Sequence, residues 1–404
     1  MGEPDVAQPE GAQLSLSAVP LAEAAVTEST RLRAALLREI SAAGPITFRR
    51  FMERCLYDPD GYYAAGTPTG RRGDYLTSPE LHPLFGALVA RQVAEMWEAL
   101  GRPVRLGLVE MGGGNGTLMR GLLAAATSAP LGAALQPVFV EPIPINRQAQ
   151  RATLGSLAES VRWVATLHDL PADALDPGVL LSNELVDSFP VHRVAVRSGV
   201  LHEVYVGCGR GKFVEVLGKP STPELALYFE RLGLLPGEGC LAEVNLDALT
   251  WIRDVAATLH RGFVLTFDYG YEAPQLYAPW RRDGTLLCYY GHTAGTDPFV
   301  RVGRQDLTAH VDFTSLQLAG SAAGLHTLGL VSQRDFLAAL GIGDALTGGP
   351  AAAPNLEEYL ARRRAVEALL NPEGLGRVRV LAQAKGVAGA RLVAFAPEGL
   401  AGRA

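Results

Sequence analysis

Short apolar segments alternate with helix-like segments through most of the chain, and this alternation constrains the fold more than any other feature. Each apolar segment is followed by turn residues and mostly by a helical stretch; the segments are LGLVEM, PVFVE, VRWVA, GVLLSN and GFVLTFD. Continuous apolar runs of this length are typical of parallel strands that are buried on both faces. The pattern predicts an α/β fold in which a mostly parallel sheet is covered by helices on both sides.

The segments around this sheet region have different patterns and divide the chain into parts. The start is acidic and rich in Pro, Ala and Ser, which predicts a disordered tail. Three alternating segments joined by Gly-containing turns predict an antiparallel insertion in the sheet region. The predicted parts are a disordered tail (1–30), an N-terminal helical region (31–104) with a functional loop (61–80), a sheet domain (105–386) with an insertion (about 191–238) and a C-terminal tail (387–404).

The net charge and the longest uncharged stretch argue against nucleic acid and membrane as partners. The formal net charge of -6 does not favour a surface that neutralises nucleic-acid phosphates. The longest uncharged stretch, residues 121–140, is interrupted by Pro130 and Pro137, so we expect no membrane insertion. The histidines include no HExxH pair and no cluster with metal-ligand spacing, so we expect no metal. A small molecule or a protein is the expected substrate.

The cysteines and the first charges bear on the cellular compartment. The four cysteines lie far apart, with no CxxC pair and no dense framework that would suggest disulfides. The first positive charge is Arg31, which is unlike a secretory signal or an Arg-rich transit peptide. These features predict a cytoplasmic protein.

The segment VEMGGGNGTL is the strongest candidate for a ligand-binding loop. It places Glu110 at the end of a predicted strand and Gly112, Gly114 and Gly116 in the turn that opens the next helix. Glycine permits positive φ and a close approach of the backbone to a ligand. Glu141 ends the next predicted strand, where a carboxylate can accept hydrogen bonds from both hydroxyls of a ribose. The sequence therefore predicts a nucleoside site at the carboxyl edge of the sheet.

Two other interpretations of this loop are possible. The glycines could form a structural turn with no ligand, although the two acids and the flanking strands favour nucleoside binding. A dinucleotide site would need a further glycine for the pyrophosphate, but Thr117 and Met119 occupy the candidate positions. The missing glycine disfavours a nicotinamide-dependent oxidoreductase.

Acidic residues follow another predicted strand, in the segment LLSNELVDSFPVH. Asn183, Glu184 and Asp187 lie just beyond the strand end, and the two acids share a face if the segment is helical or turn-like. Two carboxylates in this arrangement can hold a guanidinium through charge-assisted, bidentate hydrogen bonds. The alternative is an N-capping Asn followed by acids that stabilise the first turn of a helix.

Five further residues are candidates for the same site. Asp268 ends the strand LTFDYG, where it either faces the pocket or caps a turn. His310, in DLTAHVDF, either orients a substrate or has a structural role. Thr77, Ser78 and Glu80 lie in the polar loop and could close over a ligand, although Ser78 before a proline could simply start a helix.

Several segments together resemble the MidA-type methyltransferases, relatives of the mitochondrial complex I assembly factor that methylates a protein arginine. They extend from Ile46 to about Gly386, and GRRGDYLTSPE and DLTAHVDF are the most specific of them. The resemblance implies a Rossmann-like class I fold with a mostly parallel seven-stranded sheet and an N-terminal helical region. The shared segments are ITFRRFM, DPDGYY, GRRGDYLTSPELHPLFG, VEMGGGNGTL, NELVDSFPVH, LTFDYG, GTLLCYYGH and DLTAHVDF.

The resemblance also implies a donor and an acceptor. It implies that S-adenosyl-L-methionine binds near Gly112, Gly114, Gly116 and Glu141, and that the acceptor lies near Glu184 and its neighbouring acid. The implied activity is methyl transfer to an arginine of a protein substrate, with a respiratory complex I subunit as a candidate. An alternative is an assembly protein that binds S-adenosyl-L-methionine but transfers no methyl group. The oligomeric state stays open, with a homodimer as one option.

The sequence departs from the family pattern at three places. The glycine loop is GGGNG where GPGRG is expected, and Ile143 replaces a small polar residue after the ribose acid. Ala165 stands where the family usually has an acid that could contact the adenine amine. Asp169, four residues further along, is the candidate substitute for that contact.

Overall fold

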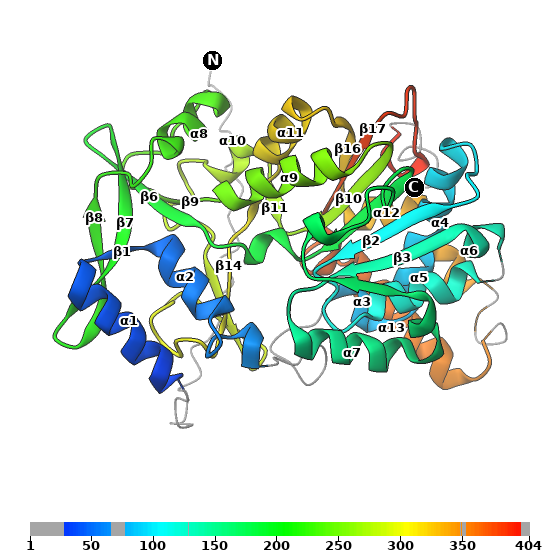
Figure 1. Cartoon of the computed structure of the whole chain (residues 1–404), viewed down its shortest axis with the longest axis horizontal. Coiled ribbons are helices and arrows are strands. Elements are labelled where there is room, and N and C mark those ends of the chain that lie inside the picture. The colour runs from blue at the N-terminus through cyan, green and yellow to red at the C-terminus, as the bar shows by residue number, and fades with distance from the viewer. Residues whose placement is uncertain (1–27, 66–76, 128, 348, 350–352, 397–404) are drawn as a thin grey trace, which may run out of the picture.

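The computed structural model describes residues 28–65, 77–127, 129–347, 349 and 353–396. Most of the predicted N-terminal tail, the middle of the predicted loop 61–80 and the end of the C-terminal tail lie outside the described residues. The described residues form two lobes, a larger one around a long sheet and a smaller one that contains the first helices (Figure 1).

The larger lobe is built on a seven-stranded sheet with the strand order β16-β17-β10-β5-β2-β3-β4. The five strands from β10 to β4 are parallel, whereas β17 runs antiparallel to both of its neighbours. The α/β class and the largely parallel sheet are confirmed. The strands are β2 (Leu106–Met111), β3 (Leu135–Val140), β4 (Arg162–Val164), β5 (Gly178–Asn183), β10 (Gly262–Asp268), β16 (His326–Ser332) and β17 (Arg379–Lys385).

Both faces of this sheet are buried, which explains why its strands are continuous apolar runs. In β10, Phe263 and Leu265 belong to one apolar core while Val264, between them, belongs to the core on the opposite face. Helices on the first face are α4 (Leu84–Ala99), α5 (Thr117–Ala126), α12 (Gln333–Ala339) and α13 (Leu356–Leu370). Those on the second face are α9 (Leu246–Thr258) and α11 (Phe313–Ala322). Helix α8 (Glu224–Leu232) joins the same apolar core from the side of the smaller lobe (Figure 1).

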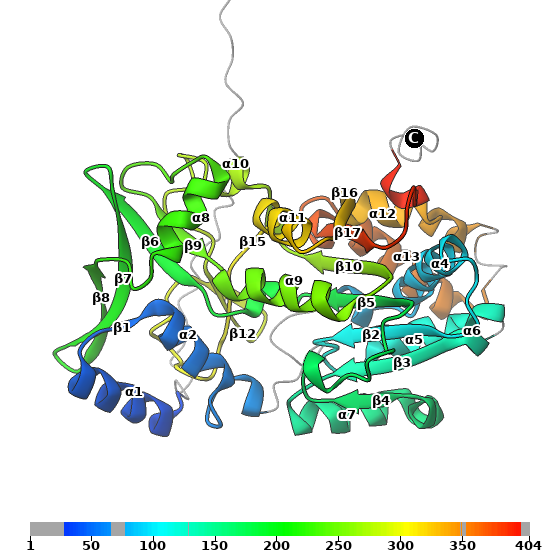
Figure 2. The ribbon, with the colours of Figure 1, turned by 45° about the horizontal axis from the view of Figure 1, so that its top comes forward.

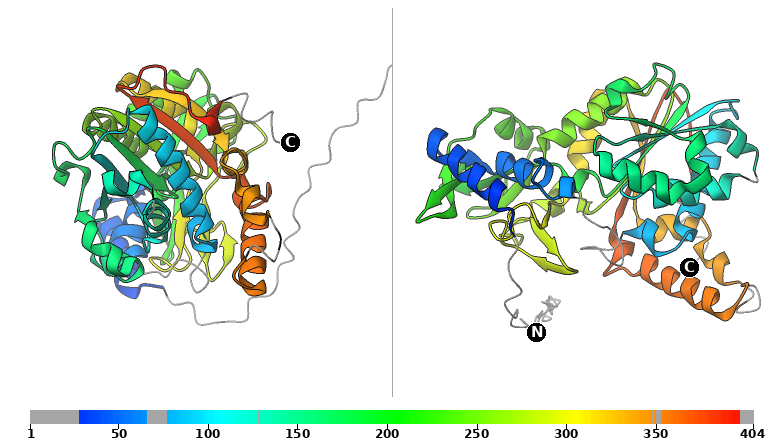
Figure 3. Two further views of the ribbon diagram at one scale, coloured as in Figure 1. Left: turned by 90° about the vertical axis from the view of Figure 1, so that its right-hand side faces the viewer. Right: turned by 60° about the horizontal axis from the view of Figure 1, so that its bottom comes forward.

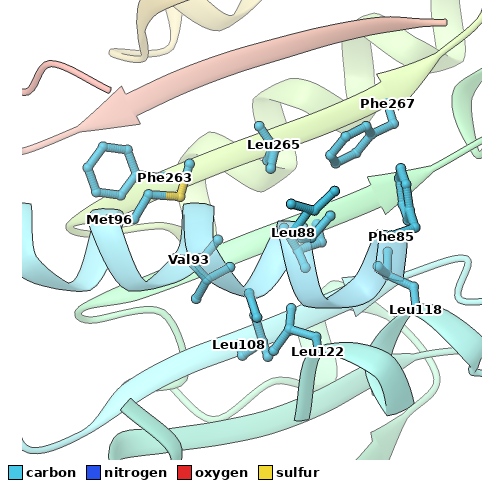
Figure 4. Close-up of a cluster of buried hydrophobic side chains, with 14 of the residues drawn as sticks. Phe85, Leu88, Val93, Met96, Leu108, Leu118, Leu122, Phe263, Leu265 and Phe267 are labelled. Atoms are coloured by element: carbon cyan, nitrogen blue, oxygen red, sulfur yellow. The ribbon is translucent and has the colours of Figure 1, made fainter. Parts of the chain in front are cut away.

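Helix α4 illustrates how the first face is packed. Its fully buried side chains Phe85, Leu88, Val93 and Met96 lie against the sheet strands and α5 (Figure 4). Burying one such side chain contributes about 1.5–3 kcal/mol, so a single stripe of this helix fixes it firmly on the sheet. The residues that begin α5, directly after the glycine loop, are held by the same core.

The smaller lobe contains a five-stranded antiparallel sheet in the order β1-β7-β6-β9, with β8 paired to β7. Helices α1 (Thr30–Ala43) and α2 (Phe48–Tyr57) pack on it (Figure 2). The strands are β1 (Ile46–Thr47), β6 (His192–Arg197), β7 (Val200–Gly209), β8 (Lys212–Gly218) and β9 (Leu241–Val244).

Two details of the predicted organisation differ from this arrangement. The predicted helical region 31–104 is divided, because α1 and α2 pack in the smaller lobe whereas α4 packs on the long sheet. In the right-hand view of Figure 3, α1 lies towards one end of the molecule and α13 towards the other. The antiparallel insertion also extends past residue 238, since β9 pairs with β6. Amphipathic patterns show that one face is buried but not which surface covers it.

The segment after β10 contains short strands and one short helix. They are β11 (Gly270–Tyr271), α10 (Ala273–Leu276), β12 (Leu287–Tyr290), β13 (Thr293–Gly295), β14 (Asp306–Thr308) and β15 (Val311–Asp312). Within the described part of the chain, no helix has both the length and the apolar character needed to cross a membrane.

Candidate active site

A cavity of about 640 Å³ opens at the carboxyl ends of β2, β3 and β5. Its other walls come from α2, from the short helix α3 (Ser78–Leu81), from α7 (Pro144–Leu154) and from the start of α9. The loops after parallel strands meet at this edge of a sheet, which is where such folds bind ligands. The cavity therefore lies between the long sheet and the smaller lobe.

The glycine loop forms one wall of the cavity through backbone that other residues adopt with difficulty. Gly112, Gly114 and Gly116 have φ values of +70°, +48° and +87°. A Cβ on Gly112 would come within 2.7 Å of the Leu185 side chain, whereas a Cβ on Gly114 would meet no atom within 4 Å. Gly112 and Gly114 line the cavity, while Gly116 instead caps α5. The loop thus exposes backbone to the cavity, which allows the close approach of a ligand.

Glu141 lies on the neighbouring wall and is held by three donors from its own loop and helix. Its Oε1 accepts a hydrogen bond from the Ile143 N–H at 2.9 Å, and its Oε2 accepts from Asn146 and Gln150 at 3.3 Å each. Burial raises the pKa of Glu141, and these donors act against that rise. Gln150 also donates to the Gly114 carbonyl at 3.0 Å, so it joins the two predicted walls of the site.

Glu110 is buried at the base of the same cavity. Its side chain is only 2% exposed, and its Oε2 has no hydrogen-bond partner in the described structure. Burial raises the pKa of Glu110 to about 8. A buried polar atom without a partner is rare, and one that lines a cavity is suited to a polar ligand.

Asn183 and Glu184 line the far part of the cavity, where β5 ends. Glu184 has φ of +50°, and its N–H donates to the Phe267 carbonyl of β10 at 2.9 Å. Asn183 Nδ2 donates to Glu184 Oε1 at 3.2 Å. Burial raises the pKa of Glu184 to about 8, and the charge of Asp187 adds to this effect. A left-handed non-glycine residue at a cavity is a marker of functional constraint.

Asp187 and Asp268 do not line the cavity. The predicted pair of Glu184 and Asp187 is therefore not formed there. Asp268 Oδ2 accepts from the N–H groups of Val186 and Asp187 at 2.8 and 3.3 Å, which caps the short 3₁₀ turn after Glu184. The left-handed backbone at Glu184 turns the chain, and Asp187 is buried beside Asp268 instead of beside the cavity. Asp268 Oδ1 also accepts the Tyr269 N–H at 2.9 Å, which agrees with the predicted alternative that Asp268 caps the turn before Gly270.

The polar loop contributes two of its three predicted residues. Thr77 and Glu80 line the cavity and form a capping box, and Asn115 Nδ2 donates to Glu80 Oε1 at 2.8 Å. Ser78 instead points into the protein, where its hydroxyl donates to Gln333 Oε1 at 2.9 Å. The end of the predicted loop is thus tied directly to the glycine loop.

His310 and Asp169 lie away from the cavity. His310 lines a second cavity, beside Tyr271. Asp169 is exposed and forms a capping box with Thr166, whose N–H and hydroxyl both donate to Asp169 Oδ2 at 2.9 Å. The sequence position of Asp169 after a strand suggested a ligand contact, but local capping accounts for this carboxylate.

Sequence analysis did not identify several residues that line or support the cavity. Tyr57, at the end of α2, donates to the Ser188 carbonyl at 3.0 Å and brings the smaller lobe to the cavity. Asp247, at the start of α9, lines the same region. The position of Gln150 in the helix after Glu141 could have indicated a residue near the site. Its contact with the distant Gly114 carbonyl, however, leaves no pattern in the sequence.

The comparisons with known proteins identify the family. Residues 88–331 match the family model Methyltransf_28, which describes S-adenosyl-L-methionine-dependent methyltransferases. The chain belongs to this family. It is an S-adenosyl-L-methionine-dependent methyltransferase, and the predicted family resemblance and cofactor are confirmed.

Relatives of this methyltransferase match it over most of their length. The mitochondrial protein arginine methyltransferase NDUFAF7 homolog of Drosophila melanogaster is 31% identical and covers 88% of this chain and 85% of its own. Mitochondrial protein arginine methyltransferase NDUFAF7 of Homo sapiens is 27% identical, with coverage of 76% and 72%. A crystal structure from Burkholderia thailandensis, bound to S-adenosyl-homocysteine, is 37% identical with a TM-score of 0.83 and covers 91% of this chain and 95% of that chain.

The predicted cytoplasmic location is wrong. The relatives from Drosophila melanogaster, Rattus norvegicus and Homo sapiens are all named as mitochondrial proteins, which contradicts it. The prediction rested partly on the spacing of the cysteines. Widely spaced cysteines indicate only that no disulfide framework is needed, and this does not distinguish the cytoplasm from other reducing compartments.

Proposed function

We propose that S-adenosyl-L-methionine binds in the 640 Å³ cavity, with its ribose on Glu141 and its amino acid part beside the glycine loop. The open space at Gly114 and the partnerless oxygen of Glu110 support this placement. The predicted sheet domain, 105–386, would then be a Rossmann-like class I donor domain, with its insertion extended to Val244. The donor supplies a methyl group on a positively charged sulfur, and the chain's residues align that group with an acceptor.

Gln150 gives a test of this placement, because it connects the glycine loop to Glu141. Gln150→Leu leaves the Trp163 N–H and the Gly114 carbonyl without their partners, and it removes a donor from Glu141. We expect the dissociation constant for S-adenosyl-homocysteine, measured by calorimetry, to rise roughly tenfold. Gln136→Leu, at an exposed site on β3, is the control and should leave it unchanged. Equal affinities in the two variants would argue against this placement of the ribose.

We further propose that the acceptor is an arginine guanidinium of a protein, which binds at the end of the cavity formed by Glu184, Asn183 and Glu80. The observation that carries this proposal is the continuity of one cavity from the glycine loop to Glu184. The relatives named as protein arginine methyltransferases support the same acceptor. A subunit of respiratory complex I is the first protein to test.

The charge on Glu184 explains how this end of the cavity could serve an arginine. A free guanidinium keeps its proton up to a pKa above about 12, so its nitrogens are poor nucleophiles. A carboxylate that accepts hydrogen bonds from two of its N–H groups orients the third nitrogen and concentrates electron density on it. The new bond would join that nitrogen to the methyl carbon while the bond from this carbon to the donor's sulfur breaks, and S-adenosyl-homocysteine would be the leaving group. The proton that the nitrogen releases would pass to Glu184 or to water.

Transfer of labelled methyl groups tests the activity. Protein, radiolabelled S-adenosyl-L-methionine and a mitochondrial extract should give labelled protein bands, and hydrolysis of these bands should yield methylarginine. The bands should be absent with Glu184→Gln. Label recovered only in other amino acids would overturn the proposed acceptor. Binding of the donor with no labelled protein would instead support an assembly role without transfer.

The raised pKa of Glu184 predicts a pH dependence. The pKa of about 8 means that the carboxyl is mostly protonated below this pH and ionised above it. Because the guanidinium binds the ionised form, kcat/KM for the arginine acceptor should rise from about pH 7 to about pH 9. Glu110 also has a raised pKa of about 8, so the affinity for S-adenosyl-homocysteine should be measured over the same range. A flat profile of kcat/KM would contradict this role of Glu184.

A further inference from the structure

A second cavity of about 340 Å³ lies beyond the end of β10, separate from the one that we assign to the donor. It is bordered by β11, by the junction of β16 with α12 and by the start of β17. The cavity is notable for its arginines: Arg334, Arg377 and Arg379 all line it. None of the proposed chemistry uses these residues.

These arginines have no acidic partner among the described residues. No ion pair is formed by Arg334, Arg377 or Arg379 in the part of the chain that the structure describes, and the buried Nε of Arg379 has no hydrogen-bond partner there. Asp335 lines the same cavity, but its Oδ2 accepts the hydroxyl hydrogen of Ser332 at 2.6 Å. The cavity therefore carries an excess of positive charge.

A histidine also lines this cavity, and a fourth arginine lies beside it. The Arg281 guanidinium lies 4.6 Å from the centre of the Tyr271 ring, which lines the cavity, and its buried Nε also lacks a partner in the described structure. His310 Nδ1 is buried in the wall without a partner. Burial, together with Arg281 and Arg377, lowers the pKa of His310 to about 4, so this ring is neutral near pH 7. An anion would have several donors available here.

Tyr269 places this cavity next to the proposed arginine site. It follows Asp268, which caps the turn after Glu184, and it lines the second cavity. The Arg377 guanidinium lies 5.7 Å from the centre of the Tyr269 ring. Burial and the Glu184 charge raise the pKa of Tyr269, and Arg377 lowers it, so this side chain lies within the field of both groups. Geometry gives the same proximity, because the Phe267 carbonyl accepts the Glu184 N–H and Tyr269 follows two residues later at the second cavity.

We propose that the second cavity binds a carboxylate side chain of the protein substrate, close to the arginine that is methylated. This inference rests on the proposed arginine methyltransferase activity and adds a substrate preference to it. The guanidinium fork of an arginine pairs with a carboxylate through two parallel hydrogen bonds, and its weak hydration lowers the cost of burial. A substrate with an acidic residue near its arginine therefore complements both sites, since its arginine meets Glu184 and its acid meets Arg377.

A free phosphate ion has similar chemistry, so the test includes it. Calorimetry measures binding of a short arginine-free peptide rich in glutamate, of the matched glutamine peptide and of inorganic phosphate. The proteins are the wild type, the double variant Arg334→Gln with Arg377→Gln, and the control Arg364→Gln. Arg364 is exposed on α13 and gives the same change of charge outside the cavity.

We expect the glutamate peptide to bind the wild type and the control equally, and the double variant roughly tenfold more weakly. The glutamine peptide should bind none of them measurably. Phosphate could instead bind more tightly than the glutamate peptide and depend on the same arginines. The site would then be one for a free anion, and the proposal would be overturned. Equal binding of the glutamate peptide to all three proteins would also overturn it.

These measurements need no turnover, so they stand apart from the proposed activity. Methyl transfer is then measured on an arginine peptide with neighbouring glutamates and on its glutamine counterpart. In the double variant, KM for the glutamate peptide should rise roughly tenfold, while kcat and the affinity for S-adenosyl-homocysteine stay unchanged. If the wild type transfers no methyl group to either peptide, the proposed arginine activity is contradicted. The calorimetric result then still tests whether the second cavity binds a carboxylate.

Discussion

Glu184→Gln should slow methyl transfer to an arginine acceptor by at least roughly 100-fold, while the dissociation constant for S-adenosyl-homocysteine stays within about twofold. The change keeps the size of the side chain and its contact with Asn183, but it removes the negative charge that would face the guanidinium. Glu184 follows β5 and Glu141 follows β3, which lie on opposite sides of β2, so the donor site should be little affected. Single-turnover rates and calorimetry measure the two effects separately.

The matched control is Glu159→Gln, which makes the same chemical change at an exposed position outside the cavity. It should transfer methyl groups at the wild-type rate. Equal rates in Glu184→Gln and the wild type would remove the proposed role of this carboxylate. A comparable loss of donor affinity would instead assign Glu184 to the donor site.

Gly114→Val should weaken binding of S-adenosyl-homocysteine by at least roughly 100-fold while the protein stays folded. The Cβ of the new side chain would meet no atom of the described structure within 4 Å, and Gly114 is one of the residues that line the cavity. The φ of +48° adds a strain of about 1–2 kcal/mol, which is too small to unfold a domain of this size. Calorimetry gives the affinity, and circular dichroism shows whether the fold survives.

Strain alone is tested with Gly233→Val. Gly233 has φ of +65° at the end of α8, where an added Cβ also meets no atom within 4 Å, but it lies outside the cavity. This variant should have a similar loss of stability and normal donor binding. In the wild type, ligand at 100 times its dissociation constant should stabilise the fold by about 2.7 kcal/mol, and Gly114→Val should lose this gain. Unchanged affinity in Gly114→Val would contradict the proposed position of the donor.

The sequence was most informative about residues at the ends of strands. Glu110, Glu141 and Asn183 each follow or end a continuous apolar run, and parallel strands bring their carboxyl ends to one edge. The glycines between Glu110 and α5 were predictable for a similar reason, because positive φ restricts the choice of residue. Both signals are local, and the order of the strands then brings them together.

Contacts between distant segments could not be predicted in this way. The two acids after β5 were expected to share a face, but the left-handed backbone at Glu184 separates Asp187 from the cavity. Gln150 and Tyr57 reach the site through tertiary packing that leaves no periodic pattern. The arginine-lined cavity is assembled from three separate strand ends, and its positive charge is hidden in an acidic overall composition.

A crystal structure of this protein with S-adenosyl-homocysteine tests the central claim most directly. The proposed site predicts that both ribose hydroxyls lie within hydrogen-bond distance of the Glu141 carboxylate, with the sulfur between the glycine loop and Glu184. A complex in which the ligand lies elsewhere, with Glu141 in contact only with Ile143, Asn146 and Gln150, would contradict the account.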